Sequence, residues 1–243
     1  MGFSKRKTPL KVAFNVDEGE YIYFDPNSKR KSITGTFEPV LINKTIEDWN
    51  ARVRINGTPG SGKSYFAGKL VRDSNKQKVL ITSVENTSKM KKLYPDDIDK
   101  LMVYDLVKIL ENVKGNILDM DLSNKLLIFD DIQTYRLSPN QKKLFNAFKN
   151  EVSCNGRQYD IDMIFLDQDI TSGMATRTNI NNTSAFVIFP GHGIWKQKEH
   201  LLKNYLYLSK EEIQKVKESK SRWIILLPEC QTVVSEKEVW VWE

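Results

Sequence analysis

The sequence predicts an α/β fold in which a mostly parallel sheet carries helices on both faces. From residue 51 onward, apolar strand-like segments alternate with helical ones, an order typical of parallel sheets. With 243 residues, 40% of them hydrophobic and 28% charged, the chain can bury a sizeable core. We expect strands at Ala51–Ile55, Lys78–Val84, Leu101–Tyr104, Lys125–Phe129, Asp160–Leu166 and Ala185–Phe189.

Residues 1–44 are predicted to form a small β-rich extension that precedes a main domain at residues 45–243. Its strand-like segments are Leu10–Phe14, Tyr21–Phe24 and Phe37–Ile42, interrupted at Asp25-Pro26-Asn27 and at Gly35. We find no internal repeat and no low-complexity segment.

Two helices carry clear start signals. Ser138 can cap a helix over Ser138–Ser153, because Pro139 suits the first helical position and Asn155-Gly156 can end the helix. A later helix begins at the capping box Ser209-Lys-Glu-Glu212. Beyond it, strands are expected to extend the sheet at Trp223–Leu227, Thr232–Val234 and Val239–Trp242. We expect Trp240 and Trp242 to pack in the core or at a sheet edge.

The strongest motif of the chain lies between the first strand of the main domain and a helix. It matches G-x-x-x-x-G-K-[ST], the phosphate-binding P-loop, and consists of Gly57, Thr58, Pro59, Gly60, Ser61, Gly62, Lys63 and Ser64. The strand Ala51–Ile55 precedes the loop, and Phe66, Leu70 and Val71 have the spacing of a helix after it. The sequence therefore predicts a nucleoside triphosphate site.

Each part of this loop has a physical role. Glycines let backbone N–H groups wrap the phosphates, and the helix N-terminus adds a partial positive charge. Lys63 is expected to reach the β- and γ-phosphates, and the Ser64 hydroxyl to ligate Mg²⁺.

A second signal is the apolar strand Lys125-Leu-Leu-Ile-Phe-Asp130-Asp131, which ends in two carboxylates as a Walker B strand does. We expect Asp130 to hold Mg²⁺ beside Ser64, and Asp131 to orient or deprotonate the attacking water. Asp131 is the base that we expect, although it is one methylene shorter than the Glu that is usual at this position. Glu85 is the alternative candidate for the base.

Gln168 ends the next strand, and its carboxamide can accept a hydrogen bond from water and donate one to phosphate. It is a candidate sensor of the nucleotide state because its strand follows the Walker B strand and is expected to lie in register with it.

The order of these motifs resembles the FtsK/HerA superfamily, and within it the genome-packaging ATPases of large double-stranded DNA viruses and virophages. The resemblance spans residues 50–190 and includes Asn-Gly-Arg157-Gln-Tyr before the strand of Gln168 and Arg177-Thr-Asn179 before the next strand. Gln158 stands where the family typically has His.

The resemblance implies a RecA-like P-loop NTPase fold, with ATP and Mg²⁺ bound between neighbouring subunits of a homo-oligomeric ring. It further implies an arginine that crosses the interface to the γ-phosphate, and we expect either Arg157 or Arg177 in this role. The implied function is an ATP-hydrolysing translocase that packages a viral genome. Its expected partners are double-stranded DNA, contacted without sequence readout, and capsid proteins.

The composition bears on where the protein is located and on which kinds of site and partner it can have. No apolar run is long enough to span a bilayer, and the N-terminus lacks the apolar segment of a signal peptide, so we expect neither a membrane span nor secretion. The family resemblance implies a virion or host-cytoplasmic location. The two cysteines and the two histidines are too isolated in the sequence to suggest a disulfide framework or a metal site. They are Cys154, Cys230, His192 and His200. The net charge of +6 is compatible with DNA, but each basic cluster also fits a solvated face.

Two other functions remain open from the sequence. A nucleotide or nucleoside kinase shares the P-loop, although no arginine-rich lid is evident. A regulatory or assembly NTPase would use the same site as a conformational switch with little turnover. The choice of ATP over GTP depends on the family resemblance.

Overall fold

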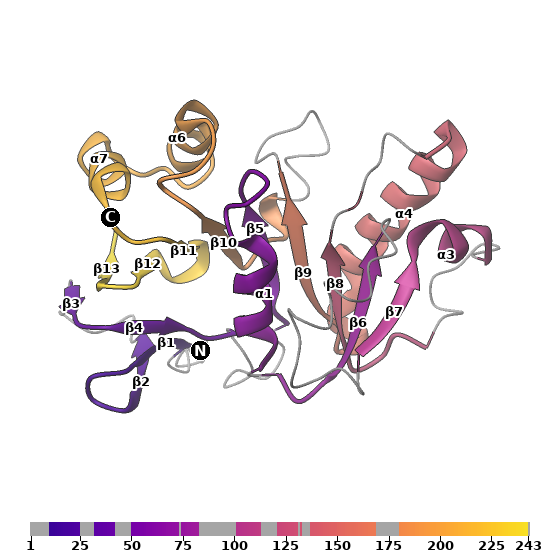
Figure 1. The fold of residues 1–243 in the computed structure, drawn as a ribbon, viewed down its shortest axis with the longest axis horizontal. Coiled ribbons are helices and arrows are strands. Elements are labelled where there is room, and N and C mark those ends of the chain that lie inside the picture. The colour runs from indigo at the N-terminus through magenta and orange to yellow at the C-terminus, as the bar shows by residue number, and fades with distance from the viewer. Residues whose placement is uncertain are drawn as a thin grey trace, which may run out of the picture.

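A computed structural model describes residues 10–24, 32–41, 50–72, 74–82, 101–112, 121–130, 132, 137–168 and 180–242. Within these residues the fold centres on one ten-stranded sheet with the order β3-β13-β12-β11-β10-β5-β9-β8-β6-β7 (Figure 1). A second sheet of three strands has the order β2-β1-β4. The predicted α/β class, with a large sheet, flanking helices and a small β-rich N-terminal region, is confirmed.

All pairings from β10 to β7 are parallel. The six predicted strands of this half are present with small shifts at their ends. They are β5 (Arg52–Asn56), β6 (Gln77–Thr82), β7 (Leu101–Asp105), β8 (Lys125–Asp130), β9 (Asp162–Asp167) and β10 (Ala185–Ile188). Every residue of β8 is buried, as expected of a strand covered on both faces.

The other half of the sheet is antiparallel, from β10 outward to β3. Its strands are β11 (Ile224–Leu227), β12 (Thr232–Ser235), β13 (Glu238–Val241) and β3 (Ser32–Thr34). Short connections dictate the direction of β11 to β13, because a parallel pair needs a crossover of a dozen residues or more. Trp240 and Trp242 are buried here, as predicted.

The described helices lie in groups on the two faces of the sheet (Figure 1). They are α1 (Lys63–Arg72), α3 (Leu106–Asn112), α4 (Pro139–Asn155), α6 (Trp195–Asn204) and α7 (Lys210–Glu218). Helix α1 packs on one face, and α3 and α4 cover the parallel half of the opposite face. Helices α6 and α7 cover the antiparallel half of that second face. The predicted capping box of Ser209 with Glu212 is present, and the predicted cap Ser138 also forms a capping box, with Gln141.

The N-terminal strands share the core of α1. They are β1 (Leu10–Asn15), β2 (Glu20–Phe24) and β4 (Phe37–Pro39). Val12 and Phe37 belong to the same apolar cluster as Phe66 of α1, so this small sheet covers the face on which α1 lies. The segment between them reaches further, because β3 pairs with β13 at the edge of the large sheet.

No described helix is long and apolar enough to cross a membrane.

A buried polar cluster holds together the starts of β5, β6 and β9. Lys76 Nζ lies 2.8 Å from Asp162 Oδ2 and donates to the Asp160 carbonyl at 2.7 Å. The other carboxylate oxygen of Asp162 accepts from Ala51 N at 2.8 Å. Asp162 is 0% exposed and Lys76 is 5% exposed. Because water does not reach them, the two charges are stabilised by their ion pair and by hydrogen bonds within the protein.

We expect Asp162→Ala to lower the free energy of unfolding by about 3 kcal/mol, because it removes the fully buried carboxylate of the Lys76 ammonium and leaves only the partly exposed Asp160 carboxylate at 3.2 Å. The control is Asp121→Ala, which removes the exposed half of the Lys125–Asp121 pair and should have little effect. Urea denaturation followed by circular dichroism measures both. Equal stability of the two variants would contradict this role of the cluster.

Candidate functional site: a phosphate-binding loop at the carboxyl edge of the sheet

The P-loop connects the end of β5 with the start of α1. Its turn requires glycine at two positions, because φ is +80° at Gly60 and +95° at Gly62, a conformation that L side chains rarely adopt. A Cβ at Gly57 would lie 2.4 Å from Ser61 Oγ, so the loop also closes too tightly there for any side chain. The three glycines of the motif are thus required by the path of the backbone.

Lys63 folds back across this loop. Its Nζ donates to the carbonyl oxygens of Gly57 at 2.6 Å and Thr58 at 3.1 Å. These bonds hold the ammonium against the loop backbone, on the segment whose N–H groups are expected to face phosphate. The side chain is therefore positioned by the loop that it would serve.

The residues of the loop fit a bound triphosphate with its metal. Ser61 Oγ is buried and has no hydrogen-bond partner within the described residues, although a buried hydroxyl normally has one. Ser64 is partly exposed in the first turn of α1, and Asp130 is buried at the end of β8. A hydroxyl and a carboxylate are ligands that Mg²⁺ accepts.

The order of the strands brings three predicted elements to one edge. Strand β9 lies between β5 and β8, so Asp130 is two strands from the P-loop strand, or about 10 Å at the usual spacing. The pairing of β8 with β9 confirms the predicted adjacency of these strands. Gln168 follows β9 directly and is exposed, while Gly57 N donates to the carbonyl of the preceding Asp167 at 3.2 Å. The carboxamide is thus carried next to the start of the P-loop.

Arg157 lies elsewhere. It belongs to the short helix η4 (Gly156–Tyr159), which precedes β9, and is exposed. Because β5 and β9 are parallel, residues before β9 lie at the edge opposite the P-loop of the same chain. Its guanidinium makes no hydrogen bond or ion pair within the described residues. Arg52 is its charged neighbour: burial lowers the pKa of Arg52, and the charge of Arg157 lowers it further.

Asp131, Arg177 and the alternative base Glu85 lie outside the described residues, and their predicted roles remain predictions.

The sequence analysis missed a charged cluster beneath Gln168. Arg54 of β5 pairs with Asp167 of β9 at 3.0 Å, and its guanidinium lies 5.3 Å from the centre of the Phe165 ring. Lys149 of α4 lies on the same ring at 5.1 Å. Burial lowers the pKa of Lys149, while Asp167 opposes that shift and Arg54 adds to it. The available signal was Arg54 between the apolar residues Val53 and Ile55 of a predicted strand, since a buried guanidinium needs a nearby carboxylate.

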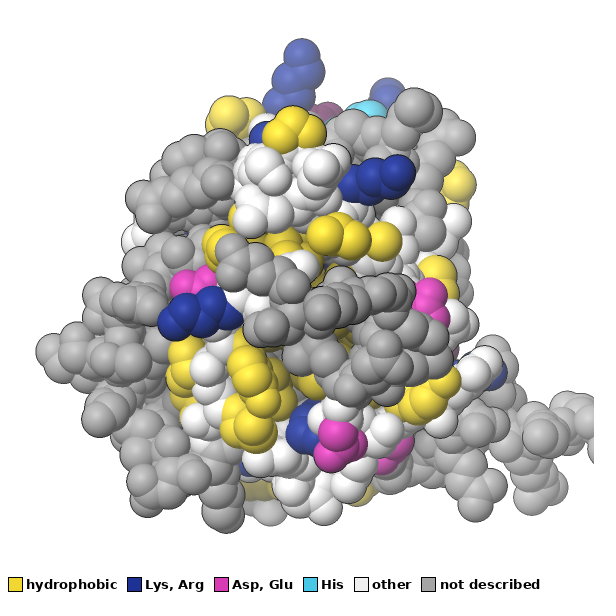
Figure 2. Space-filling model, turned by 90° about the vertical axis from the view of Figure 1, so that its right-hand side faces the viewer, with side chains coloured by type: hydrophobic (Ala, Val, Ile, Leu, Met, Phe, Trp, Pro, Cys, Tyr) yellow, Lys and Arg dark blue, Asp and Glu magenta, His cyan; other side chains and the backbone are white. Residues whose placement is uncertain are grey.

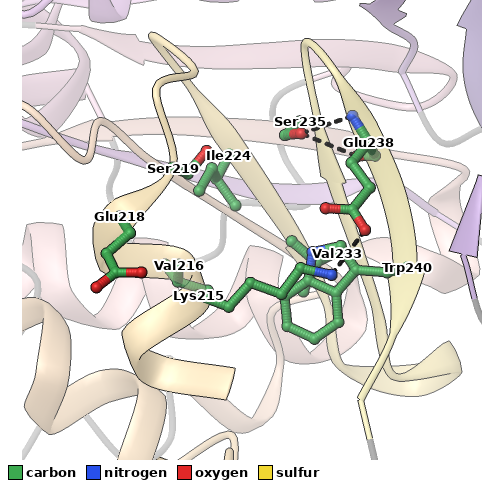
Figure 3. A pocket seen from close by; sticks show the side chains of 9 residues that line it. All are labelled: Lys215, Val216, Glu218, Ser219, Ile224, Val233, Ser235, Glu238 and Trp240. Atoms are coloured by element: carbon green, nitrogen blue, oxygen red, sulfur yellow. Dashed lines mark hydrogen bonds and ion pairs between the residues drawn. The ribbon is translucent and has the colours of Figure 1, made fainter. Parts of the chain in front are cut away.

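A hollow of about 180 Å³ lies away from the P-loop, between α7 and the strands β11 to β13 (Figure 3). Lys215 crosses it, pairs with Glu238 at 2.6 Å and covers the Trp240 ring at 4.4 Å. Glu218 accepts from Gln214 at 2.6 Å. The charged groups of this hollow therefore already interact with other residues of the protein. We interpret the hollow as a gap in the packing between the helix and the sheet.

The described basic residues do not gather on the face at the β7 edge. Among the described side chains visible there, Lys and Arg are scattered and separated by hydrophobic and uncharged groups (Figure 2).

Comparison with known proteins gives the class of fold. No family model matches the chain. It is 28% identical over 193 residues to "Uncharacterized protein V3" of Sputnik virophage, covering 72% of this chain and 69% of that protein. Among solved structures it is similar to VirB4 of Thermoanaerobacter pseudethanolicus, with a TM-score of 0.54, 11% identity and coverage of 97% and 96% of the two chains. It is also similar to the genome-packaging NTPase B204 of Sulfolobus turreted icosahedral virus 2, with a TM-score of 0.45, 17% identity and coverage of 77% and 97%.

The sheet order and the glycine-rich loop define a P-loop NTPase fold. The similarity to VirB4 agrees with this fold, and V3 is a virophage protein, in line with the predicted resemblance.

Proposed function

We propose that this chain is an ATP-hydrolysing motor that moves double-stranded DNA during packaging of a viral genome. The observation that carries the proposal is the sheet order β5-β9-β8, which places Gln168 beside the P-loop and Asp130 one strand further on. A triphosphate site with a metal carboxylate and a side chain that can sense the γ-phosphate suits a cycle of hydrolysis coupled to movement.

In this proposal Lys63 neutralises phosphate charge, and Gln168 orients the attacking water. Asp131 accepts the proton of that water, with Glu85 as the alternative. Ser64 and Asp130 hold Mg²⁺, which supplies charge neutralisation to the phosphates when bound. Backbone N–H groups around Gly60 and Gly62 bind the phosphate oxygens.

The proposal includes a homo-oligomeric ring. Arg157 is exposed and far from the P-loop of its own chain, so the nucleotide that it is proposed to serve is that of a neighbouring subunit. Arg177 is the second candidate for this role. Capsid proteins are the further partners proposed for the ring. Residues 1–44 are proposed as a β-rich extension of the ATPase domain at 45–243, with β1 and β4 in the same core as α1 and β3 paired with β13.

DNA is proposed to be gripped through its phosphates, since a motor must move along any sequence. The net charge of +6 is compatible with this contact. The role places the protein in the virion or in the cytoplasm of an infected cell.

The test is ATPase activity with and without double-stranded DNA. We expect two duplexes of unrelated sequence to stimulate hydrolysis equally. We also expect the logarithm of the DNA-binding constant to fall linearly with the logarithm of salt concentration, because bound phosphates release counterions. The measurements are phosphate release and fluorescence anisotropy between 50 and about 200 mM salt.

Other outcomes would identify the alternatives. Phosphoryl transfer to a nucleoside or nucleotide, without any effect of DNA, would indicate a kinase. Slow turnover that DNA does not change would indicate a regulatory NTPase. A strong preference for one duplex, or binding that does not depend on salt, would contradict the translocase.

A further inference from the structure

The loop that follows β10 packs directly on the P-loop. Strand β10 is the neighbour of β5 on the side away from β9. Phe189, which follows β10, lies 2.9 Å from where a Cβ at Gly57 would be, and its ring meets Phe66 of α1 edge-on at 6.2 Å. The next residues, 190–194, form a loop that we name the β10 loop.

Two features fix the β10 loop in place. Gly193 has φ +80°, and a Cβ there would lie 3.1 Å from Thr58 Cγ2, so the loop touches the second residue of the P-loop. Lys198 of α6 is 3% exposed, and its ammonium donates to the carbonyls of Phe189 at 2.7 Å and Pro190 at 3.1 Å, and also to that of His192. One buried cation thus binds three carbonyl oxygens of the turn.

The β10 loop nevertheless presents apolar surface outward. Ile194 is 64% exposed although it follows the residue that touches Thr58, and His192 is exposed beside it. An exposed isoleucine on a loop that is hydrogen-bonded in place against a phosphate-binding loop is positioned to form a wall of a nucleotide site.

The direction of the nucleotide follows from the positions of the other groups. Asp130 and Gln168, which are proposed to act at the γ-phosphate, both lie on the β9 side of the P-loop. Since the base is at the other end of an extended nucleotide, it must leave the loop on the β10 side. The β10 loop is the described segment that contacts the P-loop there.

We propose that the β10 loop is the base-side wall of the nucleotide site, with Ile194 and His192 contacting the base and Lys198 as the positioning residue that keeps the loop in shape. This inference depends on the proposed function only in that the chain binds a nucleoside triphosphate. It adds the part of the site that recognises the nucleoside.

The experiment compares ATP with tripolyphosphate, which has the phosphates but no base. Equilibrium binding of both is measured by calorimetry on the full chain and on the variants Ile194→Ala, Ile194→Asp and Lys198→Met. We expect Ile194→Ala to weaken ATP binding roughly tenfold and Ile194→Asp to weaken it more, because apolar contact with the base is lost. Tripolyphosphate binding should stay unchanged in both.

Lys198→Met should produce the same selective loss of ATP affinity, whereas general destabilisation would weaken both ligands together. If Lys198→Met does not fold, the Ile194 variants decide. The matched control is Val16→Ala, which shortens another exposed aliphatic side chain in the turn between β1 and β2 and should alter neither ligand.

The outcomes separate the two proposals. If the unaltered chain binds neither ligand, the proposed function fails. If it binds both equally well, or if the Ile194 variants retain full ATP affinity, the nucleotide site stands and the base-side wall is wrong. A change in sedimentation without a change in ATP affinity would likewise overturn it and make Ile194 an interface residue.

Discussion

Lys63→Ala should lower kcat/KM for ATP by roughly 10⁴-fold. A hydrogen-bonded charge on the phosphates contributes about 3 kcal/mol to binding, roughly a hundredfold in affinity. Stabilisation of the charge that develops on the transferring phosphoryl group adds about another hundredfold in kcat. Both effects should appear together, as weaker ATP binding in calorimetry and as loss of phosphate release.

The control for this variant is Lys69→Ala on the same helix. Lys69 lies 3.8 Å from Glu38 at a partly exposed position and faces no phosphate site, so its loss should leave binding and hydrolysis close to normal. If Lys63→Ala retained full ATP affinity, the P-loop would not be the nucleotide site. The contacts of Lys63 with Gly57 and Thr58 would then be its only role.

Arg157→Ala should bind ATP normally and hydrolyse it 10³–10⁵-fold more slowly, the range observed where an arginine finger operates. This loss corresponds to roughly 4–7 kcal/mol of transition-state stabilisation. The reason is the position of Arg157 at the edge of the sheet opposite the P-loop, from which its charge can reach only the site of a neighbour. Arg222→Ala is the control, because Arg222 is similarly exposed but pairs with Glu236 at 3.0 Å.

Mixing two inactive variants tests the geometry. A Lys63→Ala subunit supplies an intact Arg157, and an Arg157→Ala subunit supplies an intact nucleotide site, so a mixed assembly should recover part of the activity. The assemblies must first be shown to contain both subunits. No recovery in such assemblies would place Arg157 outside the shared site, and the same pair of experiments would then be made with Arg177.

The sequence alone was sufficient for the fold class, the strands of the parallel half and the phosphate loop. These features are local, because a strand, a glycine turn and a capped helix are each determined by consecutive residues. Examples are Gly57 to Ser64 and Ser138 to Gln141. The adjacency of the Gln168 strand to the Asp130 strand was also expected, because the first follows the second as the next strand in the sequence.

Other features were decided only by the tertiary structure. Three of them join residues of different elements. They are the Lys76–Asp162 cluster, the Arg54–Asp167 pair and the hydrogen bonds from Lys198 to the loop after β10. Nothing in the local sequence distinguishes Lys198 from the exposed lysines around it, because burial of a charge depends on which carbonyls or carboxylates the fold brings to it. In the same way, only the parallel pairing of β5 with β9 placed Arg157 at the edge away from the P-loop of its own chain.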